Sequence, residues 1–201
     1  MKETLILYSG GLRGQLSLCP PLYTFLKTLR AEFGVAQAHD ERRTLLVDVG
    51  EACATEVWHC AATGGRSTLI VLDAMGYHAA NVAGYLTAEA RAQLDGVVKL
   101  ALVDAQPVVQ DDLCFARDAH THDGLTVVLT PASVTEIHEQ SLRLARAGAG
   151  QVGVAHLSKT GALVAAKVLA LPPRTPPDAT IAGVVDFVES EARYFRKKRG
   201  E

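Results

Sequence analysis

Short apolar runs alternate with longer amphipathic segments along the chain, and this alternation predicts its secondary structure. Runs rich in Leu, Val and Ile that end at Gly, Pro, Asp or Asn are typical of buried β-strands. We expect strands at 4–8, 44–48, 79–83, 97–103, 125–130, 151–157 and 162–170. Because Ser158-Lys159-Thr160-Gly161 separates the last two runs, they are expected to form an antiparallel hairpin.

The segments between these runs carry apolar residues at helical spacing. Their periodicity and end signals predict helices at 20–32, 66–75, 88–94, 134–147 and 178–196. The strongest end signal is Ser133-Val134-Thr135-Glu136, a capping box in which two side chains satisfy each other's backbone amides. Thr87 is a predicted N-cap for the helix at 88–94.

This succession of strands and helices predicts an α/β fold, with mixed β-sheet layers flanked by helices. A chain of 201 residues fits one domain. The run Pro172-Pro173-Arg174-Thr175-Pro176-Pro177 favours an extended, semi-rigid linker. We therefore divide the chain into an α/β domain at 1–171, a Pro-rich linker at 172–177 and a C-terminal helix with a basic tail at 178–201.

Composition and charge narrow the possible functions. Hydrophobic residues make up 48% of the chain, which is enough for a sizeable core, and the formal net charge of −2 gives no basic field for nucleic acid.

The basic run 193–199 is interpreted as a solvated helix end, with a partner or membrane-surface tag as the alternative. No segment has the length of a transmembrane helix, and the apolar run at 4–8 is interpreted as a strand and not a signal peptide, so a cytoplasmic location is expected.

The four cysteines do not suggest a disulfide framework. Cys19, Cys53, Cys60 and Cys114 show no CxxC spacing in a long chain, so we expect buried free thiols. A soft metal at Cys53, His59 and Cys60 is the alternative, although such a site normally needs four closely spaced ligands.

A glycine-rich loop follows the first predicted strand. In α/β sheets, ligands bind at the C-terminal ends of strands, and the backbone amides of Ser9, Gly10 and Gly11 together with the side chain of Arg13 could face an anion there. The loop has neither the P-loop nor the dinucleotide-binding spacing. A tight structural turn is the alternative interpretation.

Three segments resemble the metal-binding loops of the 5′-nucleotidase-like branch of the calcineurin-type metallophosphoesterases. They are Ser9-Gly10-Gly11-Leu12-Arg13-Gly14, Asp48-Val49-Gly50-Glu51, and the stretch from Met75-Gly76-Tyr77-His78 to Gly84-Tyr85. The resemblance covers roughly residues 4–105 and implies a reduced metallophosphoesterase sandwich. In that family these loops hold a dimetal centre that hydrolyses phosphate esters.

Most residues at the corresponding metal-binding positions have the wrong chemistry. Gly11 and Arg13 stand where the family has an Asp and a His ligand, Glu51 stands at the bridging Asp, and Gly84 and Tyr85 stand at the Asn ligand and the catalytic His. Two neighbouring cations need several anionic or imidazole ligands. Glycine offers no side-chain donor, arginine adds positive charge, and an ordinary tyrosine has a pKa near 10, which makes it a poor substitute for a histidine acid.

The remaining candidate ligands are histidines. The resemblance implies a Gly-His-x-His loop after a late strand. Two segments could correspond to it, one with His120 and His122 and one with His156 and Ser158. Asp48 is a further candidate metal ligand. The alternatives are exposed loop histidines at 120 and 122 and a hydrogen-bonded core histidine at 156.

Three functions remain open at this stage. The first is a non-catalytic metallophosphoesterase-like domain without a cofactor, which binds a small anionic ligand or a protein partner. The second is a phosphoester hydrolase with a rearranged site, in which Glu51 and the histidines would bind Mn, Fe, Zn or Mg, and Tyr85 or His156 would act catalytically. The third is a structural or assembly subunit, as a homo-oligomer or with another protein.

Overall fold

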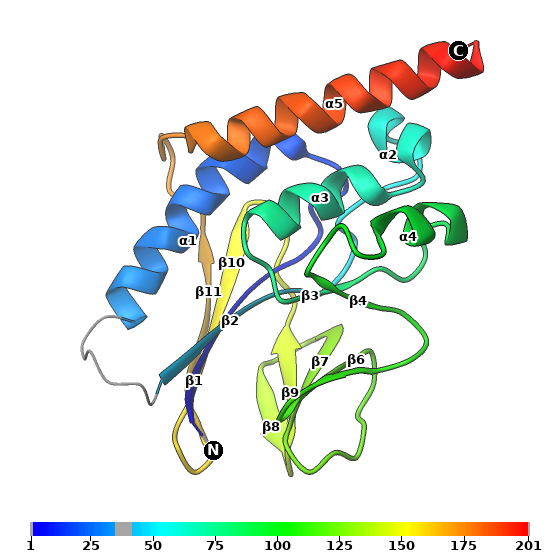
Figure 1. The fold of residues 1–201 in the computed structure, drawn as a ribbon. Coiled ribbons are helices and arrows are strands. Elements are labelled where there is room, and N and C mark those ends of the chain that lie inside the picture. Colours follow the sequence, from blue (N-terminus) through cyan, green and yellow to red (C-terminus); the bar gives the residue numbers. More distant parts are fainter. Residues whose placement is uncertain (1, 35–41, 201) are drawn as a thin grey trace.

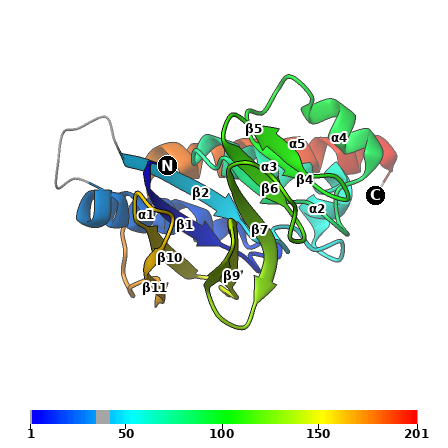
Figure 2. The same ribbon diagram turned by 90° about the horizontal axis from the view of Figure 1, so that it is seen from below.

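The computed structural model describes residues 2–34 and 42–200. Residues 1 and 35–41 of the predicted α/β domain and residue 201 of the predicted C-terminal segment therefore lie outside the described part. Two β-sheets pack against each other, and helices cover the opposite face of one of them (Figures 1 and 2). The predicted α/β fold with mixed sheets flanked by helices is therefore confirmed.

Sheet A lies between the helices and the second sheet, and its strand order is β11-β10-β1-β2-β3-β4. The strands are β1 (Glu3–Ser9), β2 (Arg42–Asp48), β3 (Ala79–Asn81), β4 (Ala101–Val103), β10 (Gln151–Leu157) and β11 (Leu163–Ala170). Strands β1 to β4 are parallel, whereas β10 is antiparallel to both β1 and β11. The predicted hairpin is confirmed, and the loops after β1, β2 and β3 lie at one end of the sheet.

Sheet B has the strand order β5-β6-β7-β9-β8. The strands are β5 (Val108–Gln110), β6 (Leu113–Ala116), β7 (Leu125–Ala132), β8 (Glu136–His138) and β9 (Ser141–Ala145). The sequence predicted β7 as a strand, but it did not predict strands at β5, β6, β8 and β9. Strands as short as β5 and β6 carry too few residues for a clear alternating pattern.

The helix predicted at 134–147 is wrong, because β8, a turn and β9 occupy this segment. Leu142 and Leu144 are fully buried while Arg143 between them is exposed, which is the period of a strand and not of a helix. The Thr135 hydroxyl caps no helix but accepts a hydrogen bond from the Ala145 amide at 3.0 Å. The chain reverses at Glu139, whose φ is +55°.

The other predicted helices are confirmed. They are α1 (Cys19–Gly34), α3 (Arg66–Ala74), α4 (Ala88–Leu94) and α5 (Ala179–Arg199). Thr87 caps α4, since its hydroxyl accepts from the Ala90 amide at 3.2 Å. The sequence missed α2 (Trp58–Thr63), which is too short to show helical periodicity.

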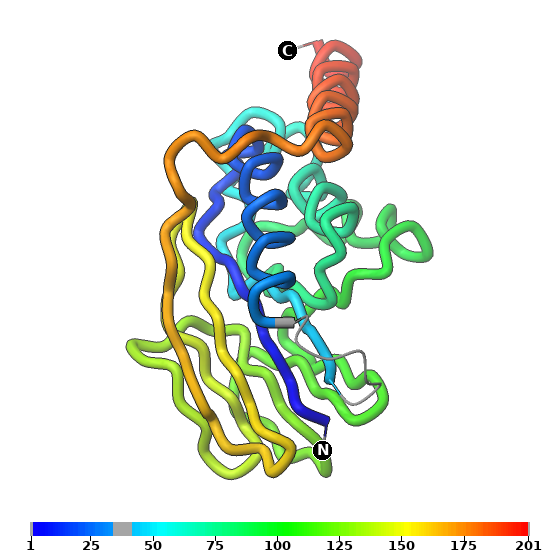
Figure 3. The backbone as a smooth tube through the Cα atoms, turned by 90° about the vertical axis from the view of Figure 1, so that its left-hand side faces the viewer, coloured from blue at the N-terminus to red at the C-terminus, as the bar shows by residue number. Residues whose placement is uncertain are grey.

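Helix α5 lies across the other helices (Figures 1 and 3). Its buried residues are Ile181, Val185, Val188 and Ala192, and it contacts α1, α2 and α3. Asp178 caps its first turn by accepting from the amides of Thr180 and Ile181. The C-terminal helix therefore packs against the body of the molecule. Among the described residues, no helix is both long and apolar enough to cross a membrane.

Two apolar clusters make up the core, one between sheet A and the helices and one between the sheets. Tyr8 lies in the second cluster with its ring fully buried against β10. A Cβ atom on Gly153 would lie only 1.8 Å from the Tyr8 Cζ atom, so this position of β10 requires glycine. The Tyr8 hydroxyl, 3.2 Å from the Thr135 Oγ1 atom, links β1 to the segment before β8.

Candidate functional site

The loops after β1 and β2 run side by side at the C-terminal end of the parallel strands. The Gly11 amide donates to the Gly50 carbonyl at 2.9 Å, and the Arg13 amide donates to the Glu51 carbonyl at 2.7 Å. Both Arg13 and Glu51 have positive φ angles, 48° and 56°. Left-handed backbone is uncommon for residues other than glycine and is often found at functional sites. The two loops therefore hold Arg13 and Glu51 as a pair.

A pocket of about 190 Å³ opens beside this pair. Arg13, Glu51, Gly84 and Tyr85 all contribute to its wall, although they come from three loops that are distant in sequence. The remaining lining residues are Cys53, Ala54, Thr55, Glu56 and Ala83. The structure thus brings together these four positions of the sequence resemblance.

Two carboxylates surround the guanidinium of Arg13. The Arg13 Nη2 atom lies 2.7 Å from the Glu56 Oε1 atom, and Nη1 lies 3.9 Å from the Glu51 Oε2 atom. A hydrogen bond from its own backbone amide and the contact with Arg13 hold the pKa of Glu56 below its usual value. With one cation and two anions, these side chains carry a net negative charge. Glu56 was not predicted as a site residue, because its only signal in the sequence is an acidic side chain in the loop after a strand.

Tyr85 forms one wall of the pocket with its hydroxyl turned inward. The side chain is 8% exposed, and the hydroxyl has no hydrogen-bond partner among the described residues. Desolvation raises the pKa of Tyr85 well above the usual value, and the charge of Asp48 acts in the same direction. This shift takes the pKa of Tyr85 further from the near-neutral value that suits a general acid.

Ser9 and Asp48 lie beneath the loops and not in the pocket. The Ser9 hydroxyl donates to the Asp48 Oδ2 atom at 3.2 Å and is 2.7 Å from the Tyr77 hydroxyl, and the Gly50 amide donates to Asp48 Oδ1 at 2.9 Å. Burial raises the pKa of Asp48 to about 8, even though the Gly50 and Ser9 hydrogen bonds lower it. A pKa raised in this direction favours the uncharged form of the Asp48 carboxyl at neutral pH, and Asp48 is not among the residues that line the pocket.

The histidine candidates lie at the opposite end of the strands. His156 is opposite Leu5 in the antiparallel pairing of β10 with β1, and its Nε2 atom is 2.6 Å from the Glu3 Oε1 atom. His120 and His122 belong to the loop before β7, where the Gly124 amide donates to the His122 Nδ1 atom at 3.0 Å. Within residues 2–34 and 42–200, no histidine lines the pocket beside Arg13.

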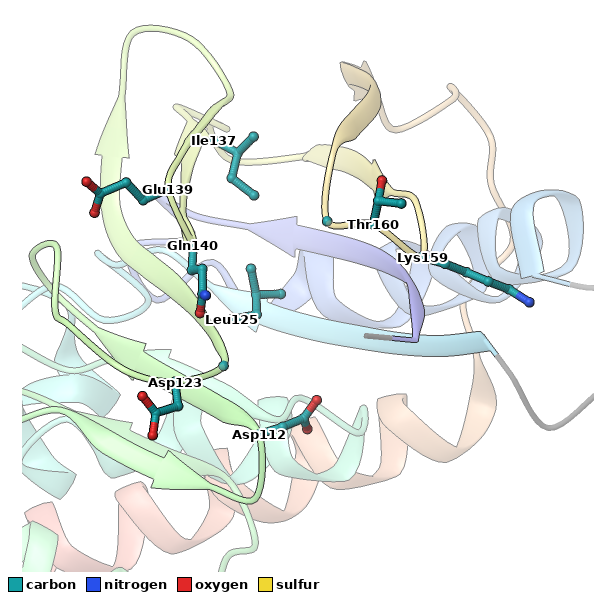
Figure 4. Close-up of a pocket in the computed structure, with 10 residues that line it drawn as sticks. Asp112, Asp123, Leu125, Ile137, Glu139, Gln140, Lys159 and Thr160 are labelled. Carbon is teal, nitrogen blue, oxygen red and sulfur yellow. The ribbon is translucent and has the colours of Figure 1, made fainter.

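The loop with His120 and His122 borders a second hollow, of about 420 Å³. Its wall combines the turn of the β10–β11 hairpin with loops of sheet B, including Asp112 and Gln140 (Figure 4). The Asp112 Oδ1 atom also lies 2.6 Å from the Arg43 Nη1 atom, near the start of β2. Because Glu51 follows the other end of β2, this hollow is far from Glu51. Figure 4 shows Glu139 and Lys159 extending away from each other, so the charged groups do not converge on one point.

The expectation of free thiols is wrong for two of the cysteines. Cys53 and Cys60 form a disulfide between the loop after β2 and helix α2. Among the described residues, Cys19 and Cys114 are free and buried, as predicted. Cys53 and Cys60 are seven residues apart, so the absence of CxxC spacing did not exclude their pairing. The path of the chain from the loop after β2 into α2 brings the two sulfur atoms together.

A dimetal centre does not fit the donors around the pocket. In the part of its wall that the structure describes, the carboxylates are those of Glu51 and Glu56, which flank Arg13. The other positions of the resemblance offer Gly84 and the buried hydroxyl of Tyr85. Within the described residues, Cys53, His59 and Cys60 are the one group of three or more potential metal-binding side chains close enough to share an ion. The described part of the pocket wall therefore lacks the set of anionic and imidazole ligands that two neighbouring cations need.

No family model matches this chain, and no curated protein matches its sequence. The relationship to metallophosphoesterases and the cytoplasmic location both stay predictions from the sequence.

Proposed function

We propose that this chain is a non-catalytic, metallophosphoesterase-like binding domain that uses Arg13 to hold the anionic group of a small ligand. One observation carries the proposal. Arg13, Glu51, Gly84 and Tyr85 line a single pocket, yet they offer neither histidine nor an unengaged carboxylate pair to a metal.

An anionic ligand would take over a hydrogen bond that Glu56 now accepts. The side chains of Arg13 and Glu56 are 53% and 66% exposed, so solvent screens their attraction and an exchange of partners is easy. The arginine fork can then bind two oxygens of a phosphate or carboxylate. Because Glu51 and Glu56 remain nearby, they oppose a doubly charged ligand. We expect a singly charged group, such as a phosphodiester, to be preferred over a phosphate dianion.

Calorimetry with a dialkyl phosphate and with inorganic phosphate at pH 8 tests this proposal. Wild-type protein is expected to bind the diester more tightly. Arg13→Gln should abolish binding, whereas Glu56→Gln should strengthen it several-fold by releasing the guanidinium. Arg174→Gln, a change of another arginine with positive φ far along the chain, serves as the control. Equal binding by wild type and Arg13→Gln would exclude the proposed role.

The alternative, a phosphoester hydrolase with a rearranged site, predicts different behaviour. The oxidised protein would contain a stoichiometric pair of Mn, Fe or Zn ions and would hydrolyse an aryl phosphate in the presence of Mn²⁺. Glu51→Ala would remove that activity. If wild type and Glu51→Ala are equally inert and metal-free, hydrolysis through this site is excluded.

An assembly function has one specific observation in its favour. Phe187 and Tyr194 stand two turns apart on α5 and are 61% and 63% exposed. Large exposed apolar side chains on one helix face are common at protein interfaces. Light scattering on wild type and on a Phe187→Ser, Tyr194→Ser double variant tests this function. A monomeric wild type would argue against self-assembly through α5.

A further inference from the structure

Cys53, His59 and Cys60 form a buried group behind the wall of the Arg13 pocket. Their potential ligand atoms all lie within 4.8 Å of one another, and the residues are only 4%, 3% and 2% exposed. We propose that the dithiol form of this group binds one soft divalent cation such as Zn²⁺, and that oxidation to the disulfide releases the ion. This inference does not depend on the proposed ligand of Arg13.

The hydrogen bonds of His59 fix which ring nitrogen is available. The Nε2 atom lies 2.8 Å from the Gly14 carbonyl oxygen, which can only accept, so Nε2 carries the proton. In the neutral ring the Nδ1 atom then has a free lone pair, and it lies 2.8 Å from the Ser67 hydroxyl and 3.7 Å from the Cys60 sulfur. Histidines that bind metals typically donate their other N–H group to such a carbonyl. Rotation about the Ser67 Cα–Cβ bond would move the hydroxyl oxygen away from Nδ1 and leave this nitrogen free to bind an ion beside the sulfur.

The surroundings of the sulfur atoms also suit thiolates. The Cys53 sulfur is 3.3 Å from the Thr68 hydroxyl and 4.0 Å from the Ser67 hydroxyl, and both hydroxyls can donate to a negatively charged sulfur. The other buried thiol of this core differs, because desolvation raises the pKa of Cys19 to about 12 and Asp48 reinforces this. Cys53 also lines the pocket, which gives a reductant and an ion a route to the group.

The glycine loop after β1 is shaped around this group. Gly14 has a φ of +78°, and a Cβ atom there would lie 3.0 Å from the Cys60 sulfur and 3.3 Å from the His59 Cε1 atom. Only glycine lets the backbone approach closely enough to accept the His59 hydrogen bond. The loop therefore accepts a hydrogen bond from the Cys–His–Cys group through Gly14 and also positions Arg13.

Reduction of the Cys53–Cys60 disulfide consumes one external dithiol. A dithiol reductant transfers two electrons and two protons to the Cys53–Cys60 disulfide; the S–S bond breaks, two thiols form, and the reductant becomes a disulfide. Zn²⁺ then replaces both thiol protons, which leave to solvent, and binds two thiolates and the His59 Nδ1 atom. Zinc prefers four ligands, so the fourth position is left for water. A disulfide oxidant reverses the electron transfer and frees the ion.

Cobalt provides the direct test, because thiolate-bound Co²⁺ absorbs in the near ultraviolet. The full chain is reduced, freed of reductant under nitrogen and titrated with Co²⁺, then with Zn²⁺ and a competing chelator. We expect one ion per chain in the reduced protein and none in the oxidised protein. Cys60→Ser and His59→Ala should weaken binding by more than the ~10–100-fold typical for loss of an outer-shell partner. Cys114→Ser and His156→Gln are the matched controls and should bind like wild type.

Absence of cobalt absorption in the reduced wild type would overturn the proposal, as would unchanged binding by Cys60→Ser. A second measurement needs no variant, in case one fails to fold. Alkylation rates of Cys53 and Cys60 in the reduced wild type, followed by mass spectrometry, should fall when Zn²⁺ is added. Equal rates with and without Zn²⁺ would likewise overturn it.

Discussion

The fold buries the Asp48 carboxyl, and this burial favours its uncharged form. Its pKa is raised to about 8 by burial, whereas an ordinary aspartate in the unfolded chain ionises near pH 4. Between these two values the folded state holds a proton that the unfolded state has lost. Stability therefore falls as pH rises through this window and levels off above pH 8.

Asp48→Asn should remove this part of the pH dependence. The amide stays neutral, can accept from the Gly50 amide and can bond to the Ser9 hydroxyl in place of the protonated acid. Urea unfolding at pH 5 and pH 8 should therefore show a larger loss of stability in wild type than in the variant. Asp112→Asn, at an exposed carboxylate, serves as the control and should keep the wild-type slope. Parallel pH profiles for wild type and Asp48→Asn would show that Asp48 is charged in the fold.

Tyr85 and Tyr8 provide a matched pair of buried tyrosines. The Tyr85 hydroxyl has no partner among the described residues, while the Tyr8 hydroxyl is 3.2 Å from the Thr135 hydroxyl. An unsatisfied buried polar group destabilises a protein by about 1–3 kcal/mol. Tyr85→Phe should therefore leave stability unchanged or raise it by up to this amount, whereas Tyr8→Phe should lower it. Thermal and urea unfolding measure both, and a destabilised Tyr85→Phe protein would indicate that its hydroxyl has a partner in solution.

Among the secondary-structure elements, the long ones could be predicted and the short ones could not. α1, α5 and the β10–β11 hairpin carry enough apolar residues for their period to be clear. α2 and β5 are too short for this, and their positions depend on contacts with distant segments. The segment 134–147 was wrongly predicted as a helix, because its capping box and the spacing of its leucines are compatible with a helix. Burial of Leu142 and Leu144 between the sheets favours the strand instead.

The strand assignment of β9 has a testable consequence. Leu142 and Leu144 are both fully buried on one face, while Arg143 points to solvent. Leu142→Ala and Leu144→Ala should each lower the free energy of unfolding by about 2–5 kcal/mol, the range for large-to-small changes in a core. Arg143→Ala should change it by less than about 0.5 kcal/mol, as for an exposed site. In a helix the two leucines would lie on different faces, so a large effect at only one of them would contradict the strand.

For the whole molecule, the chain direction of the strands decides which candidate residues meet. β1, β2 and β3 are parallel, so their following loops bring Arg13, Glu51 and Tyr85 to one end, as the sequence resemblance implied. β10 runs antiparallel to β1, so His156 near its end lies beside the start of β1. The sequence could not give this direction, because it depends on the pairing of strands far apart in the chain. The Cys53–Cys60 pairing was missed for a different reason, because these residues are only seven positions apart but do not show the CxxC spacing.

The last helix is expected to be required for the stability of the whole molecule. Ile181, Val188 and Ala192 are buried against the other helices, and full burial of a large apolar side chain contributes about 1.5–3 kcal/mol. Deletion of residues 172–201 would also leave Arg66, only 9% exposed, without its Glu191 partner at 2.8 Å. A buried charge without a partner is strongly destabilising. The shortened chain should therefore unfold at a clearly lower temperature and be cleaved faster by protease.

The Phe187→Ser, Tyr194→Ser double variant separates this role of α5 from assembly. It changes only exposed side chains of the helix, so the midpoint of thermal unfolding should stay at the wild-type value if the chain is monomeric. A dimer held by this face would instead lose mass in light scattering, and its unfolding midpoint would no longer rise with protein concentration. If the shortened chain 1–171 unfolds at the wild-type temperature, the contacts of α5 with α1, α2 and α3 do not stabilise the fold. The buried face of α5 would then make no contribution to the free energy of unfolding of the remaining domain.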